Sequence, residues 1–400
     1  MMGEKKIILE QEAGETTKSV HGGEYEFNDK YAITTPIYQT STYTFENTAQ
    51  LRDFFEGRSQ RISEYGRYGN PTQEVAEDKL CKLENAEAAL LFPSGMSAIT
   101  TAIFAICKMG DHIVITSDSY RRTRQFIRQI MSRYGVEFTL TEPDAESVEK
   151  VIKNNTRLII SESPTNPYLR VVDFEKIVAI GHKHRIKIMI DSTLATPFNF
   201  KPLDYGVDIV THSVTKYLSG HNDVLAGVLL GKSTIISAIK ELQAIIGGIS
   251  DPNSSYLIIR GLKTFPLRMQ RQNESAMIIA NYLEKHSKID KVWYPGLKSH
   301  PDYEIAKKYM KAFGGVVSFQ IKGNLETGTK FIDSMKIPKI APSIGGVESL
   351  IEQPSLMSYY ELTTQERESI GIYDNLIRFS IGIEDTEDLI KDLDQALSKI

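Results

Sequence analysis

The sequence has little cysteine, no long apolar run and no large excess of charge. Its two cysteines, Cys81 and Cys107, lie in apolar helix-like stretches. Such cysteines are typical of small core residues rather than of a disulfide or a metal site, and they fit a reducing compartment. No apolar run approaches the ~20 residues of a membrane-spanning helix. Residues 1–6 carry no apolar signal region. We therefore expect a cytoplasmic protein without a membrane span.

The net charge of −4 and the pI of about 6.1 argue against a nucleic-acid-binding surface. Apolar content is 41% and charged content 24%, both close to globular averages. A chain of 400 residues is too long for one ordinary core. The patterns predict an N-terminal arm over residues 1–60, a large domain over 61–263 and a smaller α+β domain over 264–400.

Short apolar runs that end in polar residues recur along the predicted large domain. They cover residues 112–116, 157–160, 187–190 and 207–210, and a helix-like segment over 173–184 separates two of them. This alternation is typical of the βαβ units of a mostly parallel sheet, and it predicts an α/β fold. Because ligands of such sheets bind beyond the carboxyl ends of the strands, the residues after each run are candidate site residues.

Lys216 follows the last of these runs, with Ser213 and Thr215 beside it. A lone lysine on a loop is usually solvated. A buried lysine amine can instead form a Schiff base, and hydroxyls can donate to phosphate. That interpretation requires a carboxylate for a pyridine nitrogen and an aromatic ring to cover the cofactor. Asp191 and Tyr120 each follow an apolar run and supply these two groups.

Two further stretches could bind phosphate. Ser94, Gly95 and Met96 stand at the start of a predicted helix, whose free N–H groups bind anions, although a serine there can also be an ordinary N-cap. Tyr65 and Arg67 lie in a glycine-containing loop. A guanidinium matches phosphate geometry, but the loop could equally be a solvated turn.

Taken together, these motifs resemble the Cys/Met-metabolism family of pyridoxal 5'-phosphate (PLP) enzymes, from about His21 to the C-terminus. The resemblance implies the fold-type I, aspartate-aminotransferase-like architecture. It implies that Lys216 carries the cofactor, that Tyr120 stacks on its ring and that Asp191 contacts its ring nitrogen. It places Asn166 near the ring hydroxyl, and it implies that Ser343 and Arg378 bind the substrate carboxylate. It also implies a set of phosphate-binding residues, which are Tyr65 and Arg67 of the neighbouring subunit together with Ser94, Gly95, Met96, Ser213 and Thr215.

Within the family, residues 119–124, 220–227 and 357–360 resemble the plant-type cystathionine γ-synthases. The implied reaction is γ-replacement, in which an activated homoserine ester and L-cysteine give L-cystathionine. Methionine γ-lyases typically carry a reactive cysteine two residues after the stacking tyrosine, where this chain has Arg122. We interpret Arg122 as a contact for the distal ester group.

The alternatives are a cystathionine or methionine γ-lyase and a non-catalytic PLP-binding protein. The resemblance implies amino-acid substrates and a homotetramer built from two active dimers. We expect no partnership with nucleic acid or membranes and no metal site.

Overall fold

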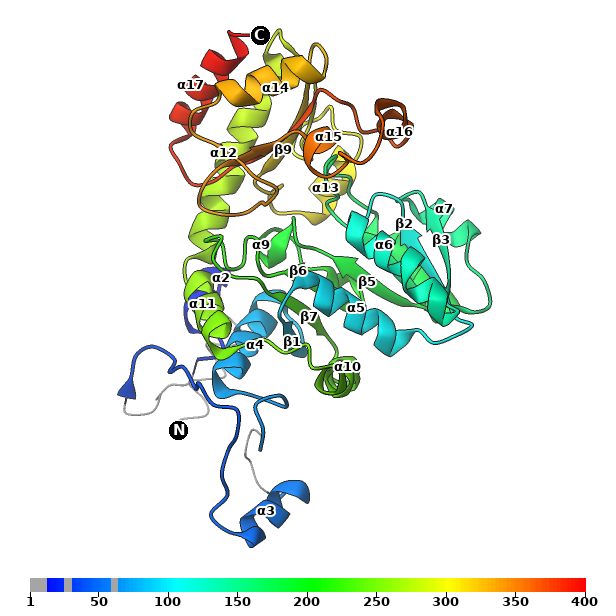
Figure 1. Ribbon diagram of the computed structural model, residues 1–400, viewed down its shortest axis with the longest axis vertical. Coiled ribbons are helices and arrows are strands. Elements are labelled where there is room, and N and C mark those ends of the chain that lie inside the picture. Colours follow the sequence, from blue (N-terminus) through cyan, green and yellow to red (C-terminus); the bar gives the residue numbers. More distant parts are fainter. Residues whose placement is uncertain (1–12, 25–30, 59–63) are drawn as a thin grey trace.

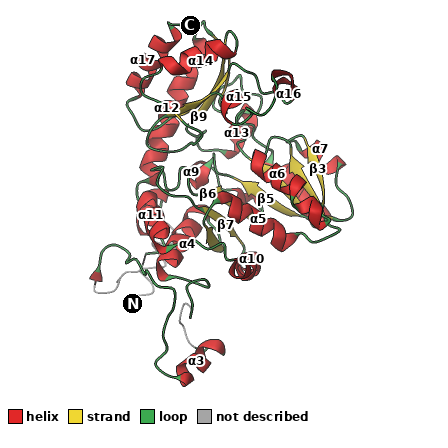
Figure 2. Ribbon diagram, viewed as in Figure 1, coloured by secondary structure: helices red, strands yellow, loops and turns green. Residues whose placement is uncertain are grey.

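The computed structural model describes residues 13–24, 31–58 and 64–400, which contain a seven-stranded and a five-stranded sheet (Figures 1 and 2). The larger sheet has the order β1-β7-β6-β5-β4-β2-β3, and β7 alone runs opposite to the other six strands. Its strands are β1 (Ala88–Phe92), β2 (His112–Thr116), β3 (Glu137–Thr141), β4 (Thr156–Glu162), β5 (Lys187–Asp191), β6 (Ile209–Ser213) and β7 (Gly227–Gly231). The mostly parallel α/β fold expected from the sequence is confirmed.

The strand bounds differ most from the prediction at β6. The apolar run at 207–210 predicts a strand there, but β6 extends through the polar residues to Ser213. All five of its residues are buried or half-buried, and Thr211 donates to the carbonyl oxygen of Val228 on β7. Pairing with a neighbouring strand satisfies the polar groups, so the strand continues beyond its apolar part.

Helices cover both faces of the larger sheet. The helices α5 (Gly95–Ile106), α6 (Arg121–Gln129) and α10 (Ser233–Ile246) pack on one face, and α8 (Phe174–His184) packs on the other. Successive strand residues alternate between these two cores: Ile113 and Leu158 point to the first, and Val114 and Ile159 to the second. A sheet buried on both faces needs continuous apolar strands, which explains the runs in the sequence. The other elements of this part are α4 (Pro71–Glu84), η2 (Met131–Tyr134), α7 (Ala145–Lys150), α9 (Thr196–Asn199), η3 (Pro202–Tyr205) and α11 (Pro252–Leu262).

The smaller sheet has the order β10-β11-β12-β9-β8 and is antiparallel except between β10 and β11. A third apolar core joins it to α12, which stands beside it in Figure 1. The sequence predicts one kinked helix over 256–286, and the structure has two, α11 and α12, with the break before Pro266. The elements are α12 (Phe265–Lys285), β8 (Ile289–Trp293), α13 (Tyr303–Tyr309), β9 (Val316–Ile321), α14 (Leu325–Ser334), β10 (Lys339–Ile340), β11 (Leu350–Glu352), α15 (Pro354–Met357), α16 (Thr364–Ser369), β12 (Leu376–Ser380) and α17 (Thr386–Leu397).

The described N-terminal residues fall into two parts. The helix α2 (Glu15–His21) packs against α4 and α12, whereas the segment that carries α3 (Thr48–Phe55) extends away from the rest of the chain in Figure 1. The expected arm over 1–60 includes residues 1–12, 25–30 and 59–60, which lie outside the described residues. The domain boundaries at 60 and 263 remain a prediction. No helix among the described residues is long and apolar enough to cross a membrane.

Candidate active site

The candidate site lies where the parallel strands end. Because β1, β2, β4, β5 and β6 run in the same direction, their carboxyl ends meet at one edge of the sheet. A cavity of about 250 Å³ opens at this edge. Its walls include most of the predicted site residues: Ser94, Gly95, Met96, Tyr120, Asn166, Asp191, Ser213, Thr215, Lys216 and Arg378. Chain topology therefore gathers residues that are up to 284 positions apart (378 − 94) into one cavity.

The start of α5 forms a close-packed cradle within the cavity. Ser94 caps the helix by accepting from the backbone N–H of Ser97 at 3.0 Å. A Cβ added to Gly95 would lie 3.1 Å from the Cβ of Ser213, and one added to Gly227 would lie 2.4 Å from the carbonyl oxygen of Ser94. Glycine at both positions lets β7, α5 and the end of β6 approach closely. The free N–H groups of the helix start fit a phosphate group.

Asp191 ends β5 and faces the same cavity. Its Oδ1 accepts from the backbone N–H of Thr193 at 3.1 Å and from the Thr193 hydroxyl at 2.5 Å. Burial raises the pKa of this carboxyl above its ordinary value, while the Thr193 bonds and His212 oppose the rise. Among the described residues no lysine or arginine forms an ion pair with Asp191. A half-buried carboxylate that lacks a protein cation fits the protonated ring nitrogen of PLP, because an opposite charge favours its ionised form.

Lys216 follows β6, and its Nζ donates to the hydroxyl of Ser343 at 2.9 Å. Burial, assisted by the positive charge of Arg378, lowers the pKa of Lys216 to about 8, although the negative charge of Glu352 opposes the shift. A lowered pKa leaves more of the amine unprotonated near neutral pH, which a nucleophile or a general base requires.

Arg378 lies on β12, opposite Glu352 on β11. Its Nη1 forms an ion pair with Oε1 of Glu352 at 3.0 Å, and both side chains are at most 4% exposed. Nη1 also donates to Asn166 Oδ1 at 3.4 Å, and Nη2 donates to the carbonyl oxygen of Ser343 at 3.1 Å. Nε is buried and has no hydrogen-bond partner. An unsatisfied guanidinium N–H beside the cavity fits a carboxylate ligand.

Four predicted site residues do not line this cavity. Ser343 is one of them, although it contacts the cavity through its bond from Lys216. Tyr65 and Arg67 line a separate hollow with residues 40–41 and 249–252. Arg67 donates to the carbonyl oxygen of Ala244, and its guanidinium lies 4.9 Å from the ring centre of Tyr68. Arg122 lines a neighbouring cavity of about 190 Å³, which shares Tyr120, Asn166 and Pro342 with the first, and its Nη1 donates to Gln125 at 2.8 Å. A single chain therefore does not bring Tyr65 and Arg67 to Lys216.

The site contains two buried acids that sequence reasoning missed. Glu162 lies in the wall of the first cavity and Glu352 in the wall of the second. A signal for Glu162 exists, since it follows an apolar run as Asp191 does. Glu352 ends a three-residue strand, which is too short for a periodic pattern.

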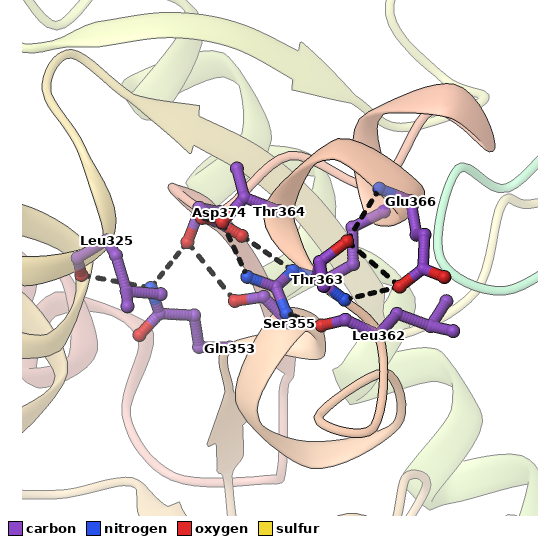
Figure 3. A network of polar contacts seen from close by, with 9 residues as sticks. Leu325, Gln353, Ser355, Leu362, Thr363, Thr364, Glu366 and Asp374 are labelled. Carbon is purple, nitrogen blue, oxygen red and sulfur yellow. Dashed lines mark hydrogen bonds and ion pairs between the residues drawn. The ribbon is translucent and has the colours of Figure 1, made fainter.

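A polar network joins parts of residues 353–374 (Figure 3), a segment of which residues 354 and 357–359 line the second cavity. Arg367 on α16 donates from Nε to Asp374 Oδ1 at 2.7 Å. The carbonyl oxygen of Asp374 accepts from Gln353 and Ser355, on either side of Pro354. These bonds join the two ends of residues 353–374.

Comparison with known proteins places the chain among enzymes of sulfur amino acids. A family model described as Cys/Met metabolism PLP-dependent enzyme matches residues 16–398. The chain is 51% identical to "Cystathionine gamma-synthase 1, chloroplastic" of Arabidopsis thaliana over 92% of its own length and 66% of that protein's. It is 41% identical to an L-methionine gamma-lyase of Fusobacterium nucleatum over 98% of its length and 99% of that enzyme's.

A solved structure has the same fold. The crystal structure of cystathionine gamma-lyase from Lactobacillus plantarum complexed with L-serine superposes with a TM-score of 0.90 at 37% identity, and the match covers 97% of this chain and 99% of the other. The alignments thus include both synthases and lyases.

Proposed function

Since the chain belongs to the Cys/Met-metabolism family of PLP-dependent trans-sulfuration enzymes, we propose that it is a cystathionine γ-synthase. In this proposal it joins O-acetyl-, O-succinyl- or O-phosphohomoserine to L-cysteine, giving L-cystathionine and the free acid. The observation that carries the choice is the 51% identity to a plant cystathionine γ-synthase, against 41% to a methionine γ-lyase. Arg122 in the wall of the second cavity adds a cation for the distal ester group.

The cofactor fits the residues of the first cavity. The N–H groups at the start of α5, with Ser213 and Thr215, would hold the phosphate, and Asp191 would hold the ring nitrogen. Tyr120 would cover the ring, and Asn166 would face its hydroxyl. When bound, PLP supplies an aldehyde that condenses with amines and an electron-poor ring that stabilises negative charge on the α-carbon of an amino acid.

In the proposed γ-replacement, different residues of the chain would bind the substrate and move its protons. Arg378 binds the substrate carboxylate, with its free Nε directed to the ligand. Lys216 would hold the cofactor, and its amine would accept the α-proton of the substrate. Tyr120 would accept a β-proton, and the acid of the ester would leave the γ-carbon with its bonding electron pair; the two protons would later return to the α- and β-carbons. The cysteine sulfur forms a bond to the same carbon, and Tyr120 stacks and moves protons.

The second candidate is a γ-lyase, favoured by the 41% identity to an L-methionine gamma-lyase along nearly the whole chain. A lyase uses the same residues but releases an α-keto acid and ammonia instead of adding a thiol. The test is turnover with each of the three esters plus cysteine, and with cystathionine or methionine alone. Cystathionine formation with at least one ester supports the synthase. Turnover confined to cystathionine or methionine alone supports the lyase.

We further propose that the active unit is at least a dimer, and by family likeness a tetramer. In a single chain Tyr65 and Arg67 lie away from Lys216, which is what a site completed by the partner subunit requires. The Arg67→Ala and Lys216→Ala homodimers should both be inactive. In a mixed dimer one site combines both defects and the other has neither, so subunit exchange should restore part of the activity. If verified hybrids stay inactive, Arg67 acts within its own chain.

A further inference from the structure

A second buried acid stands beside Asp191 in the cofactor cavity. Glu162 ends β4 and is paired in register with Asp191 at the end of β5, so both side chains leave the same face of the sheet. Glu162 is 4% exposed and lines the cavity together with Asp191 and Asn166. Oε2 of Glu162 is buried without any hydrogen-bond partner. A polar atom in that position points to a ligand.

Two carboxyls this close in a buried site do not both ionise readily. Burial raises the pKa of Glu162 well above its ordinary value, and the charges of Asp191 and Asp118 raise it further. Asp191 has the Thr193 N–H and hydroxyl to stabilise its charge, whereas the unpartnered oxygen of Glu162 has no donor. The hydrogen bonds therefore favour Asp191 as the ionised member of the pair.

The other charged groups that face Glu162 do not reverse this assignment. The positive charge of Arg124 on α6 opposes the rise in the pKa of Glu162. The Nε of Arg124 is buried and has no hydrogen-bond partner, so it does not bond to Glu162. Among the described residues Glu162 forms no ion pair. Asp118, after β2, is itself an acid whose pKa burial raises to about 6. The pKa of Tyr359 is raised mainly by burial, which keeps its hydroxyl neutral.

We propose that Glu162 is a positioning residue that remains a neutral carboxylic acid and donates a hydrogen bond from Oε2 to an acceptor atom of the bound cofactor. The protonated acid thus orients the ring while Asp191 alone supplies the negative charge. The inference requires PLP binding but not the choice between synthase and lyase, so its failure would leave the proposed function standing.

The experiment compares the wild-type holoenzyme with two variants by equilibrium dialysis of PLP from pH 6.5 to pH 9.5. Glu162→Gln keeps a neutral donor, and Glu162→Leu keeps the size without a donor. At pH 7 we expect the dissociation constant of Glu162→Gln within about threefold of wild type, and that of Glu162→Leu about tenfold weaker, as for a lost buried hydrogen bond. Glu77→Gln, which changes another buried acid outside the cavity, serves as the matched control.

The pH dependence supplies a second readout. As Glu162 ionises at high pH, it loses the proton that it donates, so the wild type should lose affinity for PLP relative to Glu162→Gln. Lys216 titrates alike in both proteins and therefore does not contribute to this difference. The proposal is overturned if Glu162→Gln binds PLP as weakly as Glu162→Leu, which would assign the function to the ionised form beside Arg124. It is also overturned if all three proteins bind alike. Should Glu162→Leu fail to fold, the comparison of wild type with Glu162→Gln at pH 9 decides.

Discussion

The amine of Lys216 should become reactive near pH 8 rather than near pH 10.5. Burial and, to a smaller extent, the positive charge of Arg378 together lower its pKa to about 8. At pH 8 about half of such an amine is unprotonated, whereas about 0.3% of an ordinary lysine amine would be. The cavity therefore increases the reactive fraction by a factor of roughly 150 at that pH. This gain should appear in the rate at which the apoenzyme takes up PLP.

The assay is stopped-flow reconstitution of the apoenzyme with limiting PLP, from pH 7 to pH 10. The rate should rise with pH and reach half its maximum near pH 8. Removing a positive neighbour raises the pKa of a lysine, so Arg378→Leu should move the midpoint upward. Removing a negative neighbour lowers it, so Glu352→Gln should move the midpoint downward. Arg122→Gln, in the neighbouring cavity, serves as the control and should leave the midpoint in place. A wild-type midpoint near 10.5, or one insensitive to both neighbours, would refute the reasoning.

Three further predictions concern the carboxylates and the distal cation. Asp191→Ala should reduce turnover severely with an unchanged circular dichroism spectrum, and Asp191→Glu should reduce turnover less. If Asp191→Ala turned over at the wild-type rate, another residue would be the partner of the ring nitrogen. Arg122→Ala should raise KM for the charged succinyl and phosphate esters more than for the acetyl ester. An equal rise for all three esters would show that Arg122 does not contact the distal group. Glu352→Ala should lower the free energy of unfolding by about 3–5 kcal/mol in urea titrations, because it leaves Arg378 buried and unpaired. Removing Arg378 as well, in the double variant with Arg378→Met, should recover part of that loss, and no recovery would show that the ion pair is not its cause.

Much of the fold could be predicted because its physical causes are local. The strands β2, β4 and β5 each contain a run of three apolar residues at their centre, as a sheet covered on both faces requires. The break between α11 and α12 follows from Pro266. The predicted residues of the large cavity come together because the carboxyl ends of parallel strands share one edge.

The remaining parts of the site depend on contacts between distant segments. Glu352 is important because β11 and β12 pair it with Arg378, and a three-residue strand gives no periodic signal. Glu162 could have been noticed at the end of its apolar run, but its lack of a partner for Oε2 is visible only in three dimensions. The separation of Tyr65 from Lys216 likewise follows from the path of the chain and not from any local pattern.

The most direct test of the central claim is the partition of one substrate between two products. Wild-type enzyme would receive a homoserine ester that it turns over, with and without saturating L-cysteine, and both cystathionine and 2-oxobutanoate would be quantified. A γ-synthase should form cystathionine as the main product when cysteine is present, with 2-oxobutanoate falling as cysteine rises. If 2-oxobutanoate and ammonia remain the main products at saturating cysteine, the chain is a lyase and the proposed function is wrong.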